Sequence, residues 1–307
     1  MKKLTKIKDL QIMADIVRED IITSLVAAGS GHSAGPLGMA DIFTALYFNA
    51  LKHNPKKPQW EGRDRLILSN GHICPVLYSA MANAGYFPKK ELLTLRKLGT
   101  RLQGHPHREA LPGLETTSGP LGSGLSQAAG MACGFKLDKK NNLVFCLCSD
   151  GEQDEGNHWE AVMFAAKYKL NNIIAITDRN YIQIDGNTEE VMPLDPLDKK
   201  YKAFNWNVLV INGNDMPEIL KVFEQARKNK GKPLMIIANT VPGKGVKFME
   251  KDYLWHGKPP KPEEALVALK LIHTKESEER GDWYKKHQGL NPLHNKKFKA
   301  SKKNDIY

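Results

Sequence analysis

The sequence has few of the features that hold small secreted proteins together. It contains four cysteines in 307 residues, and none of them forms a CxxC pair. A disulfide scaffold is therefore not indicated, and reduced structural thiols of a cytosolic protein are the simplest interpretation. Cys146 and Cys148 do not predict a metal site, because alternate residues of a strand share one face and no second cysteine pair is present.

Long apolar runs are also absent. The longest runs have the length of strands, far below the roughly 20 apolar residues that a membrane-spanning helix requires. The chain begins with a methionine and two lysines, but Asp9, Asp15 and Arg18 interrupt the apolar core that an export signal would need. We therefore expect an amphipathic first helix, a soluble cytoplasmic protein and no membrane partner.

Positive charge is unevenly distributed along the chain. The net charge is +11, but seven lysines and no acidic residue lie between Lys285 and Lys303, so this segment alone supplies +7. Nucleic-acid-binding surfaces interleave cations with aromatic residues, and aromatic residues are sparse in this segment. We therefore expect a solvated basic tail and no nucleic-acid partner.

Apolar runs of strand length alternate with segments of helical spacing over most of the chain. The expected strands lie at 65–69, 143–148, 173–177, 207–211 and 233–240. The expected helices lie at about 9–28, 39–50, 72–84, 90–97, 123–135, 157–168 and 216–229. This alternation predicts an α/β fold with a doubly wound, mainly parallel sheet flanked by helices. We expect one domain over residues 1–260, followed by a C-terminal helix and the basic tail over 261–307.

Polar residues follow two of the apolar runs. Asp150 follows the run at 143–148 in the sequence Ser-Asp-Gly-Glu, and Asn180 follows the run at 173–177 in the sequence Asp-Arg-Asn. Because ligands of parallel sheets sit beyond the carboxyl ends of the strands, both residues should face the ligand crevice. A carboxylate and an amide are hard oxygen ligands for Mg²⁺ or Ca²⁺ but too few to complete the coordination, which leaves room for substrate phosphates. The pattern predicts a site for a metal-bound diphosphate.

Histidines occupy several of the predicted turns. His32 lies in a glycine-rich loop, and His72 follows Ser-Asn-Gly at the start of a helix. His105 and His107 lie in Gly-His-Pro-His-Arg, and His256 precedes a glycine. Each alone would more often be a surface or hydrogen-bonded histidine, but four such loops above one sheet point to a shared functional site. A zinc site is the rival interpretation, and no HExxH sequence or His/Cys pair at ligand spacing supports it.

Two further segments carry possible binding groups. Residues 116–124 are rich in glycine and open a helix of small residues, which favours phosphate binding at the helix N-terminus, although close helix packing explains the same glycines. They match neither a Walker A sequence nor the dinucleotide-binding fingerprint. Glu152, Asp154, Glu155 and Glu160 crowd the start of the next helix. Such acids ordinarily complement the helix dipole, whereas burial at an interface would raise their pKa values, as is common at functional sites.

With these segments assembled, the chain resembles the N-terminal, diphosphate-binding half of a transketolase. Residues 149–180 resemble the family's thiamin diphosphate motif, which runs from Gly-Asp-Gly to Asn, with Ser149 in place of the first glycine. Further blocks match in the family's order at residues 31–38, 68–72, 104–106, 117–122 and 256–257. The resemblance covers roughly residues 10–260, and the matching blocks are highly specific when taken jointly.

The resemblance implies a thiamin diphosphate-binding fold of the PP type, with thiamin diphosphate and Mg²⁺ or Ca²⁺ as cofactors. The implied metal ligands are Asp150, Asn180 and the backbone carbonyl of Ile182. The implied cofactor contacts are His72, Gly119, Leu121, Gly151, Glu152, Asn180, Ile184 and His256. The implied catalytic residues are His32, His72, His105, His256 and Glu155, with Glu155 and Glu160 near the cofactor at a subunit interface.

The resemblance also implies an activity and a partner. The cofactor would carry a two-carbon ketol unit from a ketose phosphate to an aldose phosphate. Ordinary family members continue into a pyrimidine-binding domain, which supplies the glutamate that activates the cofactor, and into a third domain. Because this sequence stops after one domain and a basic tail, we expect a split transketolase whose C-terminal subunit carries both missing domains, assembled as an α2β2 heterotetramer.

Several alternatives remain open at the level of sequence. The chain could be the corresponding part of another thiamin enzyme, such as a deoxyxylulose-phosphate synthase or the α chain of a 2-oxo acid dehydrogenase, because fold and cofactor motif do not fix the substrate. It could also be an inactive scaffold paralogue, although retention of Asp150, Asn180 and the histidines argues against this. A third alternative is a chain cut from a longer gene product.

Overall fold

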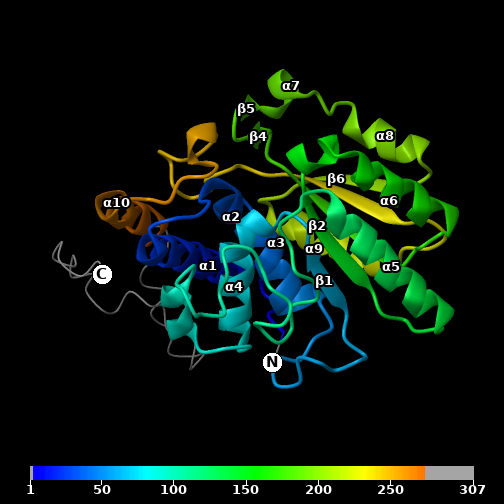
Figure 1. The fold of residues 1–307 in the computed structure, drawn as a ribbon, viewed down its shortest axis with the longest axis horizontal. Helices are drawn as coiled ribbons and strands as arrows, with labels where there is room; N and C mark the ends of the chain where they lie inside the picture. Colours follow the sequence, from blue (N-terminus) through cyan, green and yellow to red (C-terminus); the bar gives the residue numbers. More distant parts are fainter. Residues whose placement is uncertain (1–2, 274–307) are drawn as a thin grey trace.

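A five-stranded parallel sheet forms the centre of the protein (Figure 1). The computed structural model describes residues 3–273. The strand order is β1-β2-β3-β7-β6, and every neighbouring pair is parallel. The strands are β1 (Arg65–Leu68), β2 (Val144–Ser149), β3 (Ile173–Arg179), β6 (Asn207–Asn212) and β7 (Leu234–Asn239). The predicted α/β fold is confirmed.

Helices cover both faces of the sheet. They are α1 (Ile7–Ala28), α2 (Ala34–Gly38), α3 (Ala40–Ala45), α4 (Cys74–Ala84), α5 (Ser123–Leu137), α6 (Gly156–Lys167), α7 (Thr188–Val191), α8 (Leu197–Ala203), α9 (Met216–Arg227) and α10 (Pro262–His273). Shorter elements are the π-helical turn η1 (Leu46–Ala50), the 3-10 turns η2 (Gly71–Ile73), η3 (Lys89–Thr94), η4 (Gly151–Asp154) and η5 (Tyr253–Trp255), and the two-stranded antiparallel sheet of β4 (Ile182–Gln183) and β5 (Gly186–Asn187).

Alternate residues of the strands supply two separate hydrophobic cores. Phe145 and Ile174 face the layer that contains α1, α3, α4 and α9, whereas Cys146 and Ala175 face the layer of α5, α6 and α8. Successive side chains of a strand point to opposite faces, so strands that are buried on both sides must be continuously apolar. This requirement explains why the central runs could be recognised in the sequence.

One predicted helix takes a different form. The sequence predicts an α-helix over residues 90–97, but the segment forms the 3-10 turn η3, which ends at Thr94 and is followed by Leu95 with non-helical backbone angles. Arg96 then adopts a φ of 60°, a left-handed value that cannot continue a right-handed helix. The change of direction places the Arg96 side chain against Gly104, in the loop that carries His105.

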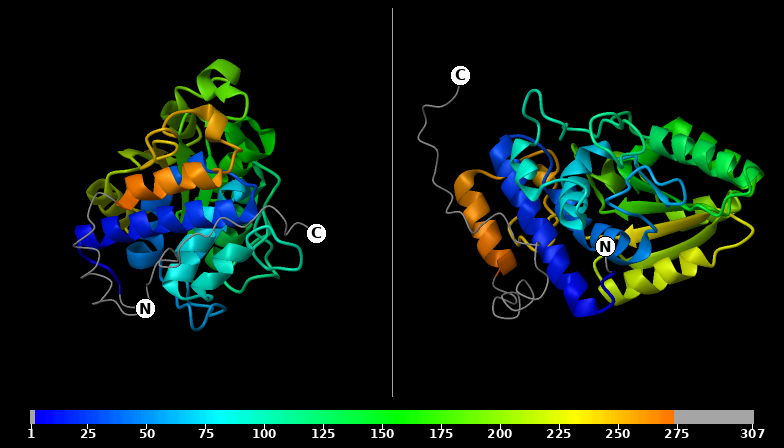
Figure 2. Two further views of the ribbon diagram at one scale, coloured as in Figure 1. Left: turned by 90° about the vertical axis from the view of Figure 1, so that its left-hand side faces the viewer. Right: turned by 90° about the horizontal axis from the view of Figure 1, so that it is seen from below.

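The last described helix packs on the first one. Figure 2 shows α10 lying alongside α1, and Ala265, Ala268 and Ile272 of α10 are buried in the same core. The basic tail that the sequence predicts lies outside the described residues. Within residues 3–273, no helix is long and apolar enough to cross a membrane.

The chain passes close to itself where the glycine-rich segment enters α5. A Cβ atom at Gly124 would lie 2.3 Å from Ser69 Cβ and 2.6 Å from Ser69 Cα, whereas a Cβ at Gly130 of the same helix would meet no atom within 4 Å. The Gly124 amide also donates a hydrogen bond of 3.0 Å to Ser69 Oγ. The close-packing explanation therefore holds for Gly124 and fails for Gly130.

We expect opposite effects of the same substitution at these two positions. Gly124→Ala should lower the free energy of unfolding by about 1–3 kcal/mol, because the added methyl group overpacks against the end of β1. Gly130→Ala should raise it by about 0.5–1 kcal/mol, because alanine loses less backbone entropy in a helix. Urea denaturation of both variants measures the difference, and equal stabilities would contradict the packing described above.

Candidate active site

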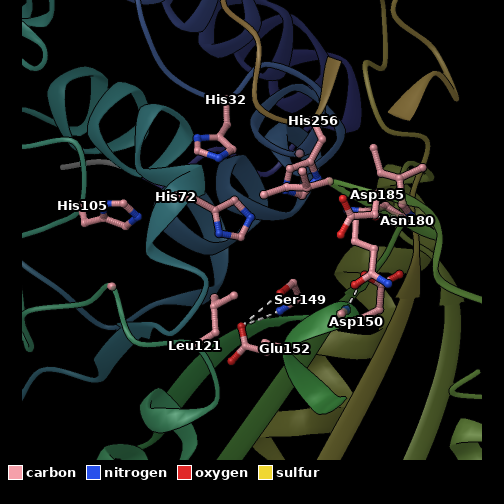
Figure 3. Close-up of a pocket in the computed structure, with 16 residues that line it drawn as sticks. His32, His72, His105, Leu121, Ser149, Asp150, Glu152, Asn180, Asp185 and His256 are labelled. Carbon is pink, nitrogen blue, oxygen red and sulfur yellow. Dashed lines mark hydrogen bonds between the residues drawn. The ribbon is translucent and has the colours of Figure 1, made fainter. Parts of the chain in front are cut away.

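A pocket of about 420 Å³ opens at the carboxyl ends of the strands (Figure 3). The predicted metal ligands, cofactor contacts and catalytic residues all line it except Glu155; Glu160, which was expected near the cofactor, does not line it either. Those lining residues are His32, His72, His105, Gly119, Leu121, Asp150, Gly151, Glu152, Asn180, Ile182, Ile184 and His256. Gly35, Ser149, Gln183 and Asp185 also line the pocket and were not singled out as site residues from the sequence.

Neighbouring strands bring Asp150 and Asn180 together. Strands β2 and β3 pair in a register that aligns Ser149 with Asp178, so the residues that follow them leave the sheet side by side. Asp150 is 1% exposed and Asn180 is 7% exposed. Both therefore face the pocket from the carboxyl edge of the sheet, as expected for this topology.

Hydrogen bonds fix the Asp150 carboxylate in place. Oδ1 accepts from the Gly151 amide at 2.8 Å, and Oδ2 accepts from the Tyr181 amide at 2.7 Å. Burial raises the pKa of Asp150 to about 6, although these bonds and the neighbouring Arg179 oppose the rise. A cation bound here would stabilise the ionised carboxylate that burial disfavours.

The Asn180 amide is oriented by a buried acid. Asn180 Nδ2 donates to Asp178 Oδ2 at 2.8 Å, and Asn180 Oδ1 accepts from the Ile182 amide at 3.0 Å. Asp178 also accepts a short hydrogen bond from Thr240, which follows β7. Because a carboxylate holds the NH₂ group, the amide oxygen is directed to the other side and keeps a lone pair for a cation. The oxygens of Asp150, Asn180 and Ile182 are a donor set that fits Mg²⁺ or Ca²⁺.

Glu152 holds three loops together beneath the pocket. Its Oε1 accepts from Ser69 Oγ at 2.5 Å and from the Gly122 amide at 3.3 Å, and its Oε2 accepts from the Ser149 amide at 2.9 Å. These bonds join the ends of β1 and β2 to the glycine-rich segment before α5. Burial raises the pKa of Glu152, and the same hydrogen bonds oppose the rise. Glu152 therefore contributes mainly by positioning the loops.

Three histidines meet on the opposite side of the pocket from Asp150 and Asn180 (Figure 3). The ring centroid of His32 lies 4.9 Å from that of His72 and 5.5 Å from that of His256, and the His72 and His256 centroids are 5.3 Å apart. The three residues come from the loop before α2, from η2 and from the end of η5. The predicted convergence of separate histidine loops is therefore present in the structure.

Burial keeps these imidazoles uncharged. Burial, together with smaller contributions from the nearby His256, Arg96 and His105, lowers the pKa of His32 to about 4. Burial also holds the pKa of His72 well below its ordinary value and lowers the pKa of His256. Neutral imidazoles near pH 7 can accept protons from sugar hydroxyl groups or donate hydrogen bonds to a developing oxyanion.

Some predicted groups lie elsewhere. Glu155 and Glu160 are exposed at the start of α6 and do not line the pocket. Cys148, Glu152 and His158 lie within 4.8 Å of one another on the α6 side of β2. Both carboxylate oxygens of Glu152 already accept hydrogen bonds. We therefore assign the cluster of Cys148, Glu152 and His158 a packing role and not a metal-binding one.

Unpaired polar atoms in the pocket test whether a polar cofactor fits. His32 Nδ1 and Gln183 Nε2 are buried and have no hydrogen-bond partner among the described residues. Buried polar atoms are usually paired, so a ligand with hydrogen-bonding groups would satisfy them. Gly119 lines the pocket and has a φ of 152°, a value at which any other residue would be strained. Because glycine has no side chain, a ligand can approach the backbone here. The pocket therefore fits a ligand with hydrogen-bonding groups, such as the cofactor that the resemblance implies.

The pKa of His32 gives a direct test of this electrostatic description. At pH 6 the His32 imidazole should be about 99% neutral, because its pKa of about 4 lies two units lower. Nitrogen-detected NMR of the side chain, assigned with His32→Asn, measures the titration. A midpoint near 6.5, the ordinary value for an exposed histidine, would contradict the burial described above.

Comparison with known proteins identifies the family. Residues 10–279 match the family model described as transketolase, thiamine diphosphate binding domain. The chain is 44% identical over 242 residues to the 6-deoxy-6-sulfo-D-fructose transketolase subunit SqwG of Clostridium sp. (strain MSTE9), covering 79% of this chain and 88% of that protein. It is 38% identical over 267 residues to a protein of Phocaeicola vulgatus that is named as one of the subunits of apulose-4-phosphate transketolase, covering 87% of this chain and 95% of that protein.

Solved structures give the same result. The transketolase of Campylobacter jejuni superposes with a TM-score of 0.79 at 33% sequence identity, covering 92% of this chain and 49% of that one. The chain thus spans about half the length of this solved transketolase, but most of the length of relatives that are named as subunits. It belongs to the transketolase family and matches the family's thiamin diphosphate-binding domain.

Proposed function

We propose that this chain works as one half of a two-subunit transketolase, which moves a two-carbon ketol unit from a ketose phosphate to an aldose phosphate. The observation that carries this proposal is a single pocket with the Asp150–Asn180 pair on one side and the histidine cluster on the other. Bound thiamin diphosphate would supply the nucleophilic carbon and the electron sink that the cleavage of a carbon–carbon bond requires.

The acid and amide side of the pocket would hold the diphosphate through Mg²⁺ or Ca²⁺. We assign the metal ligands to the side chains of Asp150 and Asn180 and to the backbone carbonyl of Ile182. The Asp178 carboxylate supports this assignment, because it fixes the direction of the Asn180 amide oxygen. We assign the cofactor contacts to His72, Gly119, Leu121, Gly151, Glu152, Asn180, Ile184 and His256.

The histidine side of the pocket would handle the sugar. A ketose bound between the rings would present its hydroxyl groups to His32, His105 and His256, and a neutral imidazole can accept the proton of the C3 hydroxyl when the C2–C3 bond breaks. His105 is exposed to solvent on part of its surface. Partial burial and the positive charge of Arg96 lower its pKa. His72 packs against His32 and His256 in the same pocket, and its lowered pKa keeps it in the neutral form.

A second chain would complete the site. We propose a C-terminal subunit that carries the pyrimidine-binding and third domains, with two copies of each subunit in the complex. The exposed positions of Glu155 and Glu160 at the start of α6 are compatible with an interface there. The relatives support the division into subunits, since two of them are named transketolase subunits.

The relatives also bear on the substrate. One is named for a sulfo sugar and another for a sugar phosphate. The sugars in these two names carry different acid groups, a sulfonate in one and a phosphate in the other. For this chain we propose a ketose phosphate as donor and an aldose phosphate as acceptor, because the histidine cluster addresses the hydroxyl groups and leaves the distal acid group to the partner subunit.

We expect ketol transfer only when both subunits are present. The chain mixed with its C-terminal subunit, thiamin diphosphate and Mg²⁺ should convert xylulose 5-phosphate and ribose 5-phosphate, and the chain alone should not. Asp150→Asn keeps the shape of the side chain but removes its charge, so it should weaken metal binding by at least about tenfold. A coupled assay for the released glyceraldehyde 3-phosphate, run over a series of Mg²⁺ concentrations, measures both effects.

Two results would contradict the proposal. Full turnover by the chain alone would show that no partner is needed. Decarboxylation of pyruvate by the mixture, without ketol transfer, would place the chain with another class of thiamin enzyme.

A further inference from the structure

A buried arginine directly precedes Asn180, one of the residues assigned to the metal. Arg179 ends β3, directly between Asp178 and Asn180, and is only 1% exposed. It is among the largest fully buried side chains of the described residues. A guanidinium group is always charged, so its burial requires several close acceptors.

The acceptors of Arg179 come from two different parts of the site. Its Nη1 donates to Asp150 Oδ2 at 3.4 Å and to Thr188 Oγ1 at 3.0 Å. Its Nη2 donates to Glu189 Oε1 at 2.5 Å and lies 3.2 Å from Asp195 Oδ1. One guanidinium therefore joins a carboxylate at the end of β2 to the segment of residues 188–195.

Residue 181 strengthens the same connection. Tyr181 has a φ of 63°, a left-handed value that is uncommon for residues other than glycine. This turn directs its amide to Asp150 Oδ2 at 2.7 Å, and the Arg179 guanidinium carbon lies 3.9 Å from the centre of its ring. The backbone that leads to Ile182 is thus held to the same carboxylate and the same arginine.

The segment of residues 188–195 is closed around Glu189. The two Glu189 oxygens accept from the backbone amides of Leu194 and Asp195, each at 3.2 Å, and Oε1 also accepts from Arg179. Between Tyr181 and this segment run β4 and β5, and Gln183, Ile184 and Asp185 at their connection line the pocket. The pocket wall is therefore tied at both of its ends to Arg179.

The charges of this cluster are unbalanced in the chain alone. Arg179 contributes +1, and Asp150, Glu189 and Asp195 contribute −1 each when ionised, so the sum is −2. A divalent cation beside Asp150 would bring the sum to zero. A cation at Asp150 would therefore act on the same carboxylate that Arg179 holds.

We propose that Arg179 is a positioning residue that couples cation binding at Asp150 to the ordering of residues 188–195 beside the pocket. It holds one oxygen of the Asp150 carboxylate through Nη1 while Nη2 holds the closed segment through Glu189 and Asp195. This inference rests on the proposed function, because it takes Asp150 as a metal ligand.

The test uses the complex of this chain with its C-terminal subunit, loaded with thiamin diphosphate and Mn²⁺. Electron paramagnetic resonance of free Mn²⁺ gives the metal affinity, and hydrogen exchange gives the protection of residues 188–195. Arg179→Met should weaken Mn²⁺ binding about 10–100-fold, as loss of groups that orient metal ligands does, and should remove the protection of that segment. Arg179→Lys keeps the charge without the two-armed geometry, so it should lose most of the protection.

Glu189→Gln tests whether the contact between Arg179 and residues 188–195 affects cation binding at Asp150. Glu189 is partly exposed, accepts from Arg179 and does not line the pocket, so this variant is the safer one for folding. It should weaken Mn²⁺ binding by at least about threefold, although it leaves every assigned metal ligand in place. Arg179→Met combined with Glu189→Gln should bind Mn²⁺ no more weakly than Arg179→Met alone, because both act through one link.

Arg63→Met is the matched control. Arg63 is 5% exposed and pairs with the buried Glu115 near the amino end of β1, away from the pocket. The control should leave Mn²⁺ affinity and the protection of residues 188–195 unchanged. The coupling would be overturned if Glu189→Gln left Mn²⁺ affinity unchanged, or if Arg179→Met changed either readout no more than Arg63→Met did. A wild-type complex that binds neither thiamin diphosphate nor Mn²⁺ would overturn the proposed function itself and this inference with it.

Discussion

The parallel pairing of β2 with β3 is the constraint on which the site depends. Its register sets Ser149 beside Asp178, so Asp150, one residue further along, and Asn180, two residues further along, emerge together at the carboxyl edge of the sheet. The same edge carries Ser69 after β1 and Thr240 after β7, and both make hydrogen bonds to acids of the site. A shift of this pairing by one residue would turn every side chain of one strand to the opposite face.

Burial acts in opposite directions on the two sides of the pocket. On the sheet side it raises the pKa values of Asp150 and Asp178, to about 6 and about 7, and a bound cation would oppose this rise at Asp150. On the helix side it lowers the pKa values of His32 and His72, so that they stay neutral. One wall of the pocket therefore carries carboxyl groups that a cation would stabilise, and the other carries neutral imidazoles that can accept protons. This arrangement suits a cofactor that carries a diphosphate at one end and reacts with an uncharged sugar carbon at the other.

Much of this arrangement could be predicted from the sequence. The strands were recognisable because burial on both faces requires continuous apolar runs, and Asp150 and Asn180 were recognisable because they end two such runs. The histidines were recognisable because each lies in a glycine-bearing turn. The resemblance to transketolases then predicted which residues the pocket brings together, and only Glu155 and Glu160 among them lie outside its lining.

The connections between these residues were not predictable. The orientation of Asn180 by Asp178 depends on a side-chain contact that no spacing encodes. Arg179 was visible next to the predicted ligand Asn180, but its bonds to Glu189 and Asp195 depend on how the chain folds back after β5. The segment expected to be a helix at 90–97 forms a 3-10 turn, and the left-handed φ of Arg96 prevents a helix from continuing to residue 97. The spacing of apolar residues does not predict the backbone angles of a single residue.

The most direct test is a crystal structure of the chain with its C-terminal subunit, thiamin diphosphate and Mg²⁺. The account predicts a metal about 2.0–2.1 Å from side-chain oxygens of Asp150 and Asn180 and from the Ile182 carbonyl, with the diphosphate as a further ligand. The rings of His32 and His256 should lie on the sugar side of the cofactor. A metal held by other residues, or a cofactor bound outside this pocket, would contradict the account.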